Sequence, residues 1–189
     1  MFVFLLQMRD TVQQDVALRL FSVFCALVWG LWLLKVLLSR RYHPVEAYRN
    51  EDAEILYVMM GGISETAMTW VDQKRAKGEK VGIVRFRLWR PLPADDFKAA
   101  IRGASVVAVL DRHFSPGGAG GPVAQEVKWI LYGQPKAPQI VETVVGLGGR
   151  DVTFKDFEKI YGTCKAVLGG AKVPPFELTQ VRGGHYGEV

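Results

Sequence analysis

The sequence predicts a three-layer α/β domain, in which helices cover both faces of a mainly parallel sheet. Short apolar runs that suit buried strands recur from residue 53 onward, and amphipathic stretches of helical length separate them. Strands that alternate with helices in this way pair in parallel, because a parallel pair needs a crossover connection. An apolar segment, residues 1–39, precedes the pattern and predicts an N-terminal helix outside the domain.

Four apolar runs predict the strands of the sheet. The first, ILYVMM, ends at Gly61-Gly62, and the third, SVVAVL, is the most apolar. Branched aliphatic side chains suit strands that are buried on both faces. The predicted strands are residues 55–60, 81–86, 105–110 and 140–145.

Capping and breaking residues define the helices between these strands. Ser64 suits the cap of the first helix, and Pro122 suits the first position of the third because proline lacks the N–H that would be unpaired there. Thr153 with Asp156 resembles a capping box for the fourth. The predicted helices begin near residues 64, 94, 122 and 153, and the domain, 40–168, is followed by a loose tail, 169–189.

The N-terminal segment is far more apolar than the rest of the chain. Residues 20–38 contain only Ser22 and Lys35 as strongly polar side chains, and as a helix they would cross most of a hydrocarbon core of roughly 30 Å. Arg40 and Arg41 follow the run, which would place the domain in the cytoplasm. A membrane-associated helix, a buried amphipathic helix and a segment foreign to the domain are the three interpretations.

Charge and cysteine content argue against several functions. The 24 basic and 19 acidic residues are scattered along the chain and give a net charge of only +5, a poor footprint for nucleic-acid binding. Cys25 and Cys164 lie far apart, without other Cys or His residues at metal-ligand spacing. Neither a disulfide framework nor a zinc site is therefore expected, and Cys164 is expected to face the core.

A glycine-rich loop after the third strand is the main candidate binding feature. Residues 117–121 lead into a helix whose free N–H groups and positive dipole end suit an anion, with Arg112 and His113 beside them. Ligands bind beyond the carboxyl ends of the strands in such sheets. The loop lacks the Lys-Ser or Lys-Thr of a P-loop, and Asp151 interrupts the GxGxxG spacing that begins at Gly146. The alternative is a tight turn that only packs the helix against the sheet.

Other polar and aromatic residues have simpler interpretations. His113 follows Asp111, but no nucleophile elbow accompanies the pair, so we expect a hydrogen-bonded loop histidine rather than an acid–base catalyst. The acidic cluster before the first strand is expected to be solvated rather than to bind a cation. The arginines after the second strand predict a basic face or a charged strand edge, and the tryptophans are expected to pack. These residues are Glu51, Asp52 and Glu54, Arg85, Arg87 and Arg90, and Trp70, Trp89 and Trp129.

Eight short motifs carry a family resemblance through their order. They are YHPVEAYRNEDAE at 42–54, KVGIV at 80–84, RPLP at 90–93, AVLDR at 108–112, SPG at 115–117, GP at 121–122, EVK at 126–128 and GLGGRDVT at 146–153. Together they resemble the C-terminal domain of pyruvate:ferredoxin oxidoreductase α subunits. The resemblance implies a transketolase C-terminal-like fold that helps to assemble an enzyme which oxidatively decarboxylates pyruvate or another 2-oxoacid to an acyl-CoA.

The resemblance also implies that the chemistry lies outside this chain. In the family, electrons pass from thiamine diphosphate through iron–sulfur clusters to ferredoxin, and other domains or subunits hold these cofactors and coenzyme A. The thiamine-pyrimidine domain of the family is not found in this sequence, and two cysteines cannot hold a four-thiolate cluster. The implied chain has no catalytic residue or metal site, is not catalytic alone and acts with those other domains or subunits. The alternative is a membrane-tethered binding module that kept the fold.

The candidate binding site lies at the edge of the predicted sheet where the parallel strands have their carboxyl ends. The residues there that match the family would contact an anionic ligand or a neighbouring subunit. They are Arg112, His113, Ser115, Gly117, Gly118, Gly120, Gly121, Arg150 and Asp151.

Overall fold

The computed structural model describes residues 19–35 and 43–180, which belong to two separate units, Met1–Tyr42 and His43–Val189. In the first unit, residues 19–35 form a helix whose large apolar side chains are exposed, and the rings of Trp29 and Trp32 meet edge to face. Within the described residues, no helix is both long enough and apolar enough to span a membrane. Residues 36–38 of the expected span lie outside the described residues.

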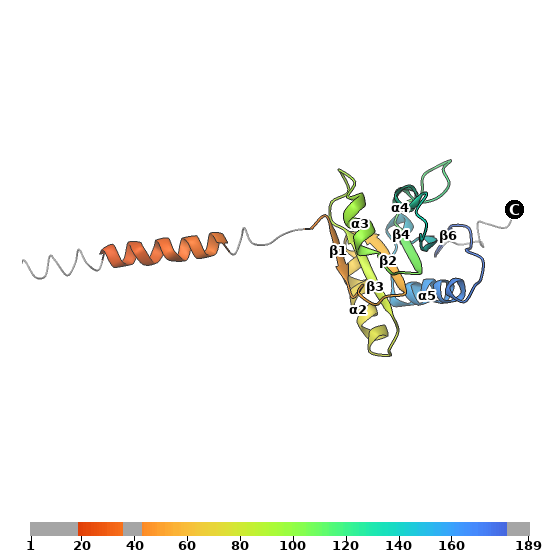
Figure 1. The fold of residues 1–189 in the computed structure, drawn as a ribbon, viewed down its shortest axis with the longest axis horizontal. Helices are drawn as coiled ribbons and strands as arrows, with labels where there is room; N and C mark the ends of the chain where they lie inside the picture. Colours follow the sequence, from red (N-terminus) through yellow and green to blue (C-terminus); the bar gives the residue numbers. More distant parts are fainter. Residues whose placement is uncertain (1–18, 36–42, 181–189) are drawn as a thin grey trace, which may run out of the picture. The chain divides into compact units, whose positions relative to one another are not determined.

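The second unit is built on a six-stranded sheet with the order β1-β3-β2-β4-β5-β6 (Figure 1). Its four central strands are parallel to one another, and each lies within one residue of a predicted strand. The mainly parallel sheet is thereby confirmed. These strands are β2 (Ile55–Met60), β3 (Val81–Phe86), β4 (Val106–Asp111) and β5 (Gln139–Val144).

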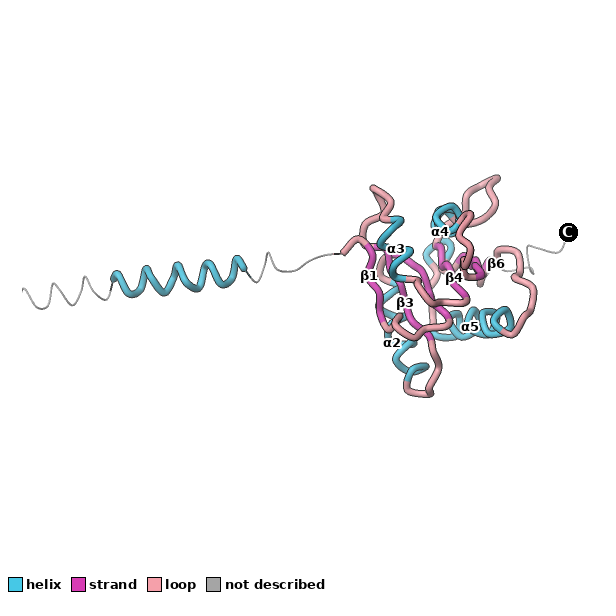
Figure 2. The backbone as a smooth tube through the Cα atoms, in the orientation of Figure 1, coloured by secondary structure: helices cyan, strands magenta, loops and turns pink. Residues whose placement is uncertain are grey.

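Helices cover both faces of the sheet, which confirms the predicted three layers. The helix α2 (Ile63–Arg75) packs with α5 (Phe154–Leu168) on one face, and α3 (Ala94–Ala100) lies with α4 (Pro122–Leu131) on the other. Figure 2 shows the strands between these two pairs of helices. A short 3-10 helix, η1 (Leu147–Gly149), follows β5.

Each face of the sheet has its own hydrophobic core. Under α2 and α5, Tyr57, Trp70 and Phe157 form an aromatic cluster, and the Tyr57 hydroxyl donates a hydrogen bond of 2.8 Å to the carbonyl of Phe157. Cys164 is fully buried in this core, as expected. Under α3 and α4, Phe86 stacks on Phe97 with ring centroids 5.1 Å apart.

The first strand of the sheet, β1 (Val45–Tyr48), was not predicted. It pairs antiparallel with β3, so β3 is not a strand edge. Gly82 allows the chain to turn back here, because a Cβ atom at this position would lie 2.3 Å from the carbonyl oxygen of Arg49. The carboxylate of Glu46 on β1 pairs with Arg85 at 2.6 Å and with Arg87 at 2.8 Å. The third arginine of this group, Arg90, pairs with Glu126 at 2.5 Å. The three arginines therefore form neither the free basic face nor the charged strand edge that the sequence suggested.

Two predicted ends of elements are corrected by the structure, and one is confirmed. Ser64 lies inside α2, where its hydroxyl donates to the carbonyl of Gly61, and Gly62 is the N-cap instead. Thr153 and Asp156 form the predicted capping box of α5. In the segment expected to be a loose tail, β6 (Glu177–Leu178) pairs with the end of β5 and Thr179 is buried.

Candidate functional site

The carboxyl edge of the sheet is organised around Asp111, the last residue of β4. This side chain is only 3% exposed, and its two carboxylate oxygens accept the backbone N–H groups of Val123 and Ala124 at 3.0 Å each. Burial raises the pKa of Asp111 above its ordinary value, against the opposing effect of these two hydrogen bonds. Asp111 thus caps helix α4 from a neighbouring strand, because the N-cap residue, Gly121, has no side chain.

A second buried carboxylate, Glu142 of β5, supports the same helix end. It is 3% exposed, accepts the N–H of Gly121 at 2.5 Å and forms an ion pair of 2.5 Å with Lys128 of α4. A buried carboxylate is stable in a folded protein when hydrogen bonds and a counter-ion compensate for its lost hydration. Asp111 and Glu142 thus connect two adjacent strands to one helix.

The glycines of this loop make room for the carboxylates. A Cβ atom at Gly120 would lie 1.7 Å from a carboxylate oxygen of Glu142, and one at Gly121 would lie 2.2 Å from a carboxylate oxygen of Asp111. Gly120 also has a φ of +125°, a conformation that other residues rarely adopt. The tight-turn interpretation therefore accounts for Gly120 and Gly121.

These contacts correct the proposed anion site. The backbone N–H groups at the start of α4 already donate to carboxylates of the chain itself, and the positive helix end already faces two negative charges. A second anion would meet like charge and no free donor there. The geometry thus disfavours anion binding at the start of α4, and contact with a neighbouring subunit stays a prediction.

The outer part of the glycine-rich loop after β4 is largely exposed, but backbone hydrogen bonds within the loop fix its conformation. The N–H of Ser115 donates to the carbonyl of Gly120 at 2.9 Å, and the N–H of Gly118 donates to the carbonyl of Ser115 at 2.8 Å. His113 is exposed and stacks on Phe114, and among the described residues it has no hydrogen-bond partner, so the expected hydrogen-bonded histidine is wrong. Gly117, at the tip of the loop, has a φ of +74°, and a Cβ atom at this position would have no other atom within 4 Å, its chain neighbours aside.

The loop after β5 meets the first loop at Gly146. The Arg112 guanidinium donates to the carbonyl of Gly146 at 3.4 Å, and the backbone oxygen of Arg150 also lies against this glycine. The side chains of Arg112, Arg150 and Asp151 are exposed. The structure thus brings the two sequence-predicted loops into one surface, which we call the carboxyl-edge loops, residues 112–119 and 146–151.

The acidic cluster before β2 contains two ion pairs. Asp52 pairs with Arg75 at 2.5 Å and Glu54 with Lys80 at 2.9 Å. Nowhere in the described ranges do three or more His, Cys, Asp or Glu side chains gather in a way that could hold a metal ion. The Arg75 guanidinium holds the pKa of Asp52 below its ordinary value.

One of the three tryptophans contradicts its expected packing role. Trp70 is 3% exposed and Trp89 packs on Phe86, but Trp129 on α4 is 70% exposed. Tyr132, just after α4, is 88% exposed. The spacing of three residues between Trp129 and Tyr132 is the sequence signal for a shared side, but it applies to a helix, and α4 ends at Leu131.

Comparison with solved structures defines the class of fold. A split-gene transketolase, described as an inactive β4 tetramer, aligns with 68% of this chain and 44% of its own chain, at a TM-score of 0.52 and 15% identity. A likeness at this identity concerns the fold alone. The second unit is a transketolase-like α/β domain, as the sequence predicted.

Sequence comparison identifies the family. Residues 53–157 match the family described as pyruvate:ferredoxin oxidoreductase core domain II, and the chain belongs to this family. The pyruvate synthase subunit PorA of Pyrococcus furiosus is 34% identical over 71% of this chain and 34% of its own length. The ketoisovalerate oxidoreductase subunit VorA of the same organism is 37% identical over 68% of this chain and 32% of its own length. The chain thus spans about a third of these relatives.

Proposed function

We propose that this chain is a docking domain of the α subunit of a pyruvate or other 2-oxoacid:ferredoxin oxidoreductase. Its carboxyl-edge loops contact a neighbouring domain or subunit of that enzyme. Two findings support the proposal: the membership of the core domain II family, and the similarity to about a third of the length of the relatives. The remaining two thirds of such a relative would supply the neighbouring surface.

One observation carries the choice of this surface. The backbone N–H groups at the start of α4 donate to the buried carboxylates of Asp111 and Glu142. The side chains of Arg112 and Arg150, in contrast, are exposed to solvent. A loop whose backbone is already fixed by hydrogen bonds, and whose side chains are exposed, loses little conformational entropy on binding another protein. Arginine is also enriched among the residues that contribute most to protein interfaces.

We assign the cofactors of the complete enzyme to parts of it outside this chain. A four-thiolate cluster needs more cysteines than the two that the sequence has, and burial raises the pKa of the Cys164 thiol to about 12, which disfavours the thiolate that binds iron. Iron–sulfur clusters are therefore assigned to other domains or subunits. The family resemblance assigns thiamine diphosphate and coenzyme A there too, and makes ferredoxin an indirect partner. The chain takes no catalytic step, and we place it in the cytoplasm with its partners.

The choice of 2-oxoacid is also assigned to other parts of the enzyme. The two relatives named for pyruvate and for ketoisovalerate are similar to this chain at nearly equal identity. A domain that resembles both to the same degree suits a common structural role.

A binding measurement tests the proposal. The full chain is titrated with the separately purified remaining subunits of a 2-oxoacid:ferredoxin oxidoreductase from the same organism. We expect the double variant Arg112→Ala/Arg150→Ala to weaken binding about tenfold or more. Lys172→Ala serves as the control, because Lys172 is exposed beyond the far end of α5. Failure of the wild-type chain to bind, or equal binding by the double variant, would contradict the proposal.

A further inference from the structure

The surface formed by α3 and α4 contains two separate hollows of about the same size, each with a volume of about 560 Å³. The first lies where the two helices begin, and the second lies where they end, beside the loops that lead into β4 and β5. Both therefore belong to one surface, which we call the α3–α4 groove. The first hollow lies at the same edge of the sheet as the carboxyl-edge loops, and the second lies at the opposite edge.

The first hollow has an apolar and aromatic wall. Leu92 and Ala94 form it on the α3 side, and Pro122 and Trp129 form it on α4. Two polar residues of α4, Gln125 and Glu126, also line the hollow, and Glu126 forms an ion pair of 2.5 Å with Arg90. Trp129 is 70% exposed, so most of its ring is in contact with solvent. An exposed tryptophan beside an apolar hollow is typical of a protein interface, where burial of the ring gives a large gain in free energy.

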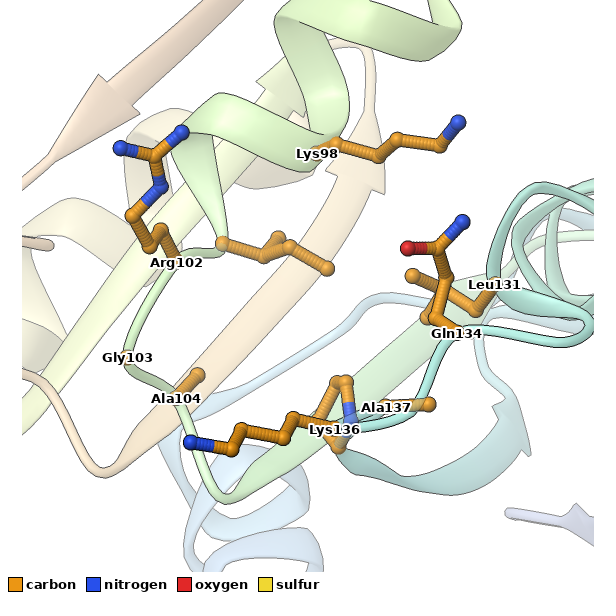
Figure 3. Close-up of a pocket in the computed structure, with 10 residues that line it drawn as sticks. Lys98, Arg102, Gly103, Ala104, Leu131, Gln134, Lys136 and Ala137 are labelled. Carbon is orange, nitrogen blue, oxygen red and sulfur yellow. The ribbon is translucent and has the colours of Figure 1, made fainter.

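The second hollow is basic and has an apolar wall. Ile101 and Leu131 form the wall, and Lys98, Arg102 and Lys136 supply three positive charges, while no acidic residue lines it. In Figure 3, the side chains of Lys98 and Gln134 extend toward each other across the hollow, and Lys136 extends back along its lower side toward Ala104.

These cations are not neutralised by their surroundings. Among the described residues, the side chains of Arg102 and Lys136 have no hydrogen-bond or ion-pair partner, and Lys98 approaches only the exposed Asp95, at 4.0 Å. Both helices end here, and their carbonyl ends carry a partial negative charge that offsets part of the positive charge. Several of those carbonyls are already paired, since Asn50 donates to Ala100 at 2.7 Å and the N–H of Ala104 donates to Ile101.

The opposite face of the sheet has a different surface. On α2 and α5, Lys74 pairs with Glu158 at 2.5 Å, and Lys165 pairs with Glu79 at 3.3 Å. Trp70 is buried between these helices. The most exposed aromatic side chains of the described domain, Trp129 and Tyr132, thus lie on the α3–α4 side, beside a hollow that three cations line.

We propose that the α3–α4 groove binds a segment of another domain or subunit of the same oxidoreductase, with apolar side chains in the first hollow and carboxylates in the second. The proposal rests on the proposed function, because that function supplies the partner. The complementary charge defines the acidic end of the segment, and Trp129 with the first hollow defines its apolar end. An amphipathic segment that places an apolar face in a groove between two helices is a common mode of peptide recognition.

The test measures binding of the full chain to the same purified subunits, with variants in each hollow. We expect Trp129→Ala to weaken binding about tenfold or more at all salt concentrations. Lys98→Glu/Lys136→Glu should weaken binding strongly at low salt and much less at high salt, because salt screens exposed charges. The control Lys77→Glu/Lys172→Glu makes the same change in charge away from the groove and should bind within about twofold of wild type. Circular dichroism of each variant verifies folding.

The possible outcomes separate this proposal from the one about the carboxyl-edge loops. If the Arg112/Arg150 variant binds weakly while the Trp129 and lysine variants bind like wild type, the groove proposal is wrong and the docking function stands. If the groove variants bind weakly and the arginine variant does not, the groove is the interface and the loops are not. Self-association of the free chain that disappears in Trp129→Ala would overturn the groove proposal, because the occupant would be a second copy.

Discussion

The carboxylate of Asp111 accepts the backbone N–H of Ala124 at 3.0 Å, and this contact fixes where helix α4 begins. We expect Asp111→Ala to lower the free energy of unfolding by about 1–3 kcal/mol, because two buried N–H groups lose their acceptors. Asp111→Asn keeps one acceptor in nearly the same shape and should cost less. Urea unfolding at neutral pH measures both, and equal stability of Asp111→Ala and wild type would exclude the capping role.

Two glycine N-caps offer a matched comparison of steric effects. Gly121 caps α4 where a Cβ atom would lie 2.2 Å from the Asp111 carboxylate, whereas Gly62 caps α2 with no atom within 4 Å. We expect Gly121→Ala to destabilise the domain by about 2–4 kcal/mol, through overpacking of about 1–3 kcal/mol on top of the weaker cap. Gly62→Ala should cost only about 0.5–1 kcal/mol, the difference between the two residues as N-caps. Thermal unfolding of both variants tests the difference, and a Gly121→Ala protein as stable as Gly62→Ala would refute it.

The pH dependence of stability should contain a contribution from Glu46. Its hydrogen bond to Arg85, with the nearby charges of Arg85 and Arg87, holds the pKa of Glu46 below the ordinary value of 4.5. A lowered pKa in the folded state stabilises the protein above pH 4.5, and the stabilisation is lost as the pH falls through the folded-state pKa. The stability of Glu46→Gln should therefore fall less than that of wild type under acid. Chemical denaturation at pH values above and below 4.5 measures the free energy of unfolding of both proteins. If the two free energies fall in parallel as the pH is lowered, Glu46 does not make this contribution.

Trp70 and Trp129 should differ sharply when each is replaced by alanine. Trp70 is 3% exposed within an aromatic cluster, so Trp70→Ala should cost about 3–5 kcal/mol of unfolding free energy. Trp129 is 70% exposed, and Trp129→Ala should change stability by no more than about 0.5 kcal/mol. Equilibrium unfolding of both variants tests this. A large loss in Trp129→Ala would mean that the ring supports the fold rather than a partner.

The parallel strands could be predicted because their signal is local. Residues 55–60 and 81–86 are short apolar runs bounded by turn or charged residues, and they became β2 and β3 without change. β1 was not predicted because Val45–Tyr48 is short and alternates in polarity, and only its pairing with β3 stabilises it. The two residues of β6 depend in the same way on β5.

The candidate site could be predicted only in outline. The glycine-rich loop was correctly placed at the carboxyl edge, but the sequence did not show that Asp111 and Glu142 would occupy the end of α4. These two residues are 31 positions apart, and they meet only because β4 and β5 pair side by side. Because the two capping carboxylates lie on different strands, their separation in the sequence depends on the connection between the strands, and no short sequence motif indicates it.

The position of β1 separates the register of the central strands from the sequence that precedes the domain. This strand leads the chain into the sheet at an outer position, runs antiparallel to the rest and pairs with β3 alone. The four parallel strands have a register that depends on one another and not on the sequence before β1. We therefore expect that a different leading sequence can be joined ahead of residue 43 without changing the alignment of the central strands.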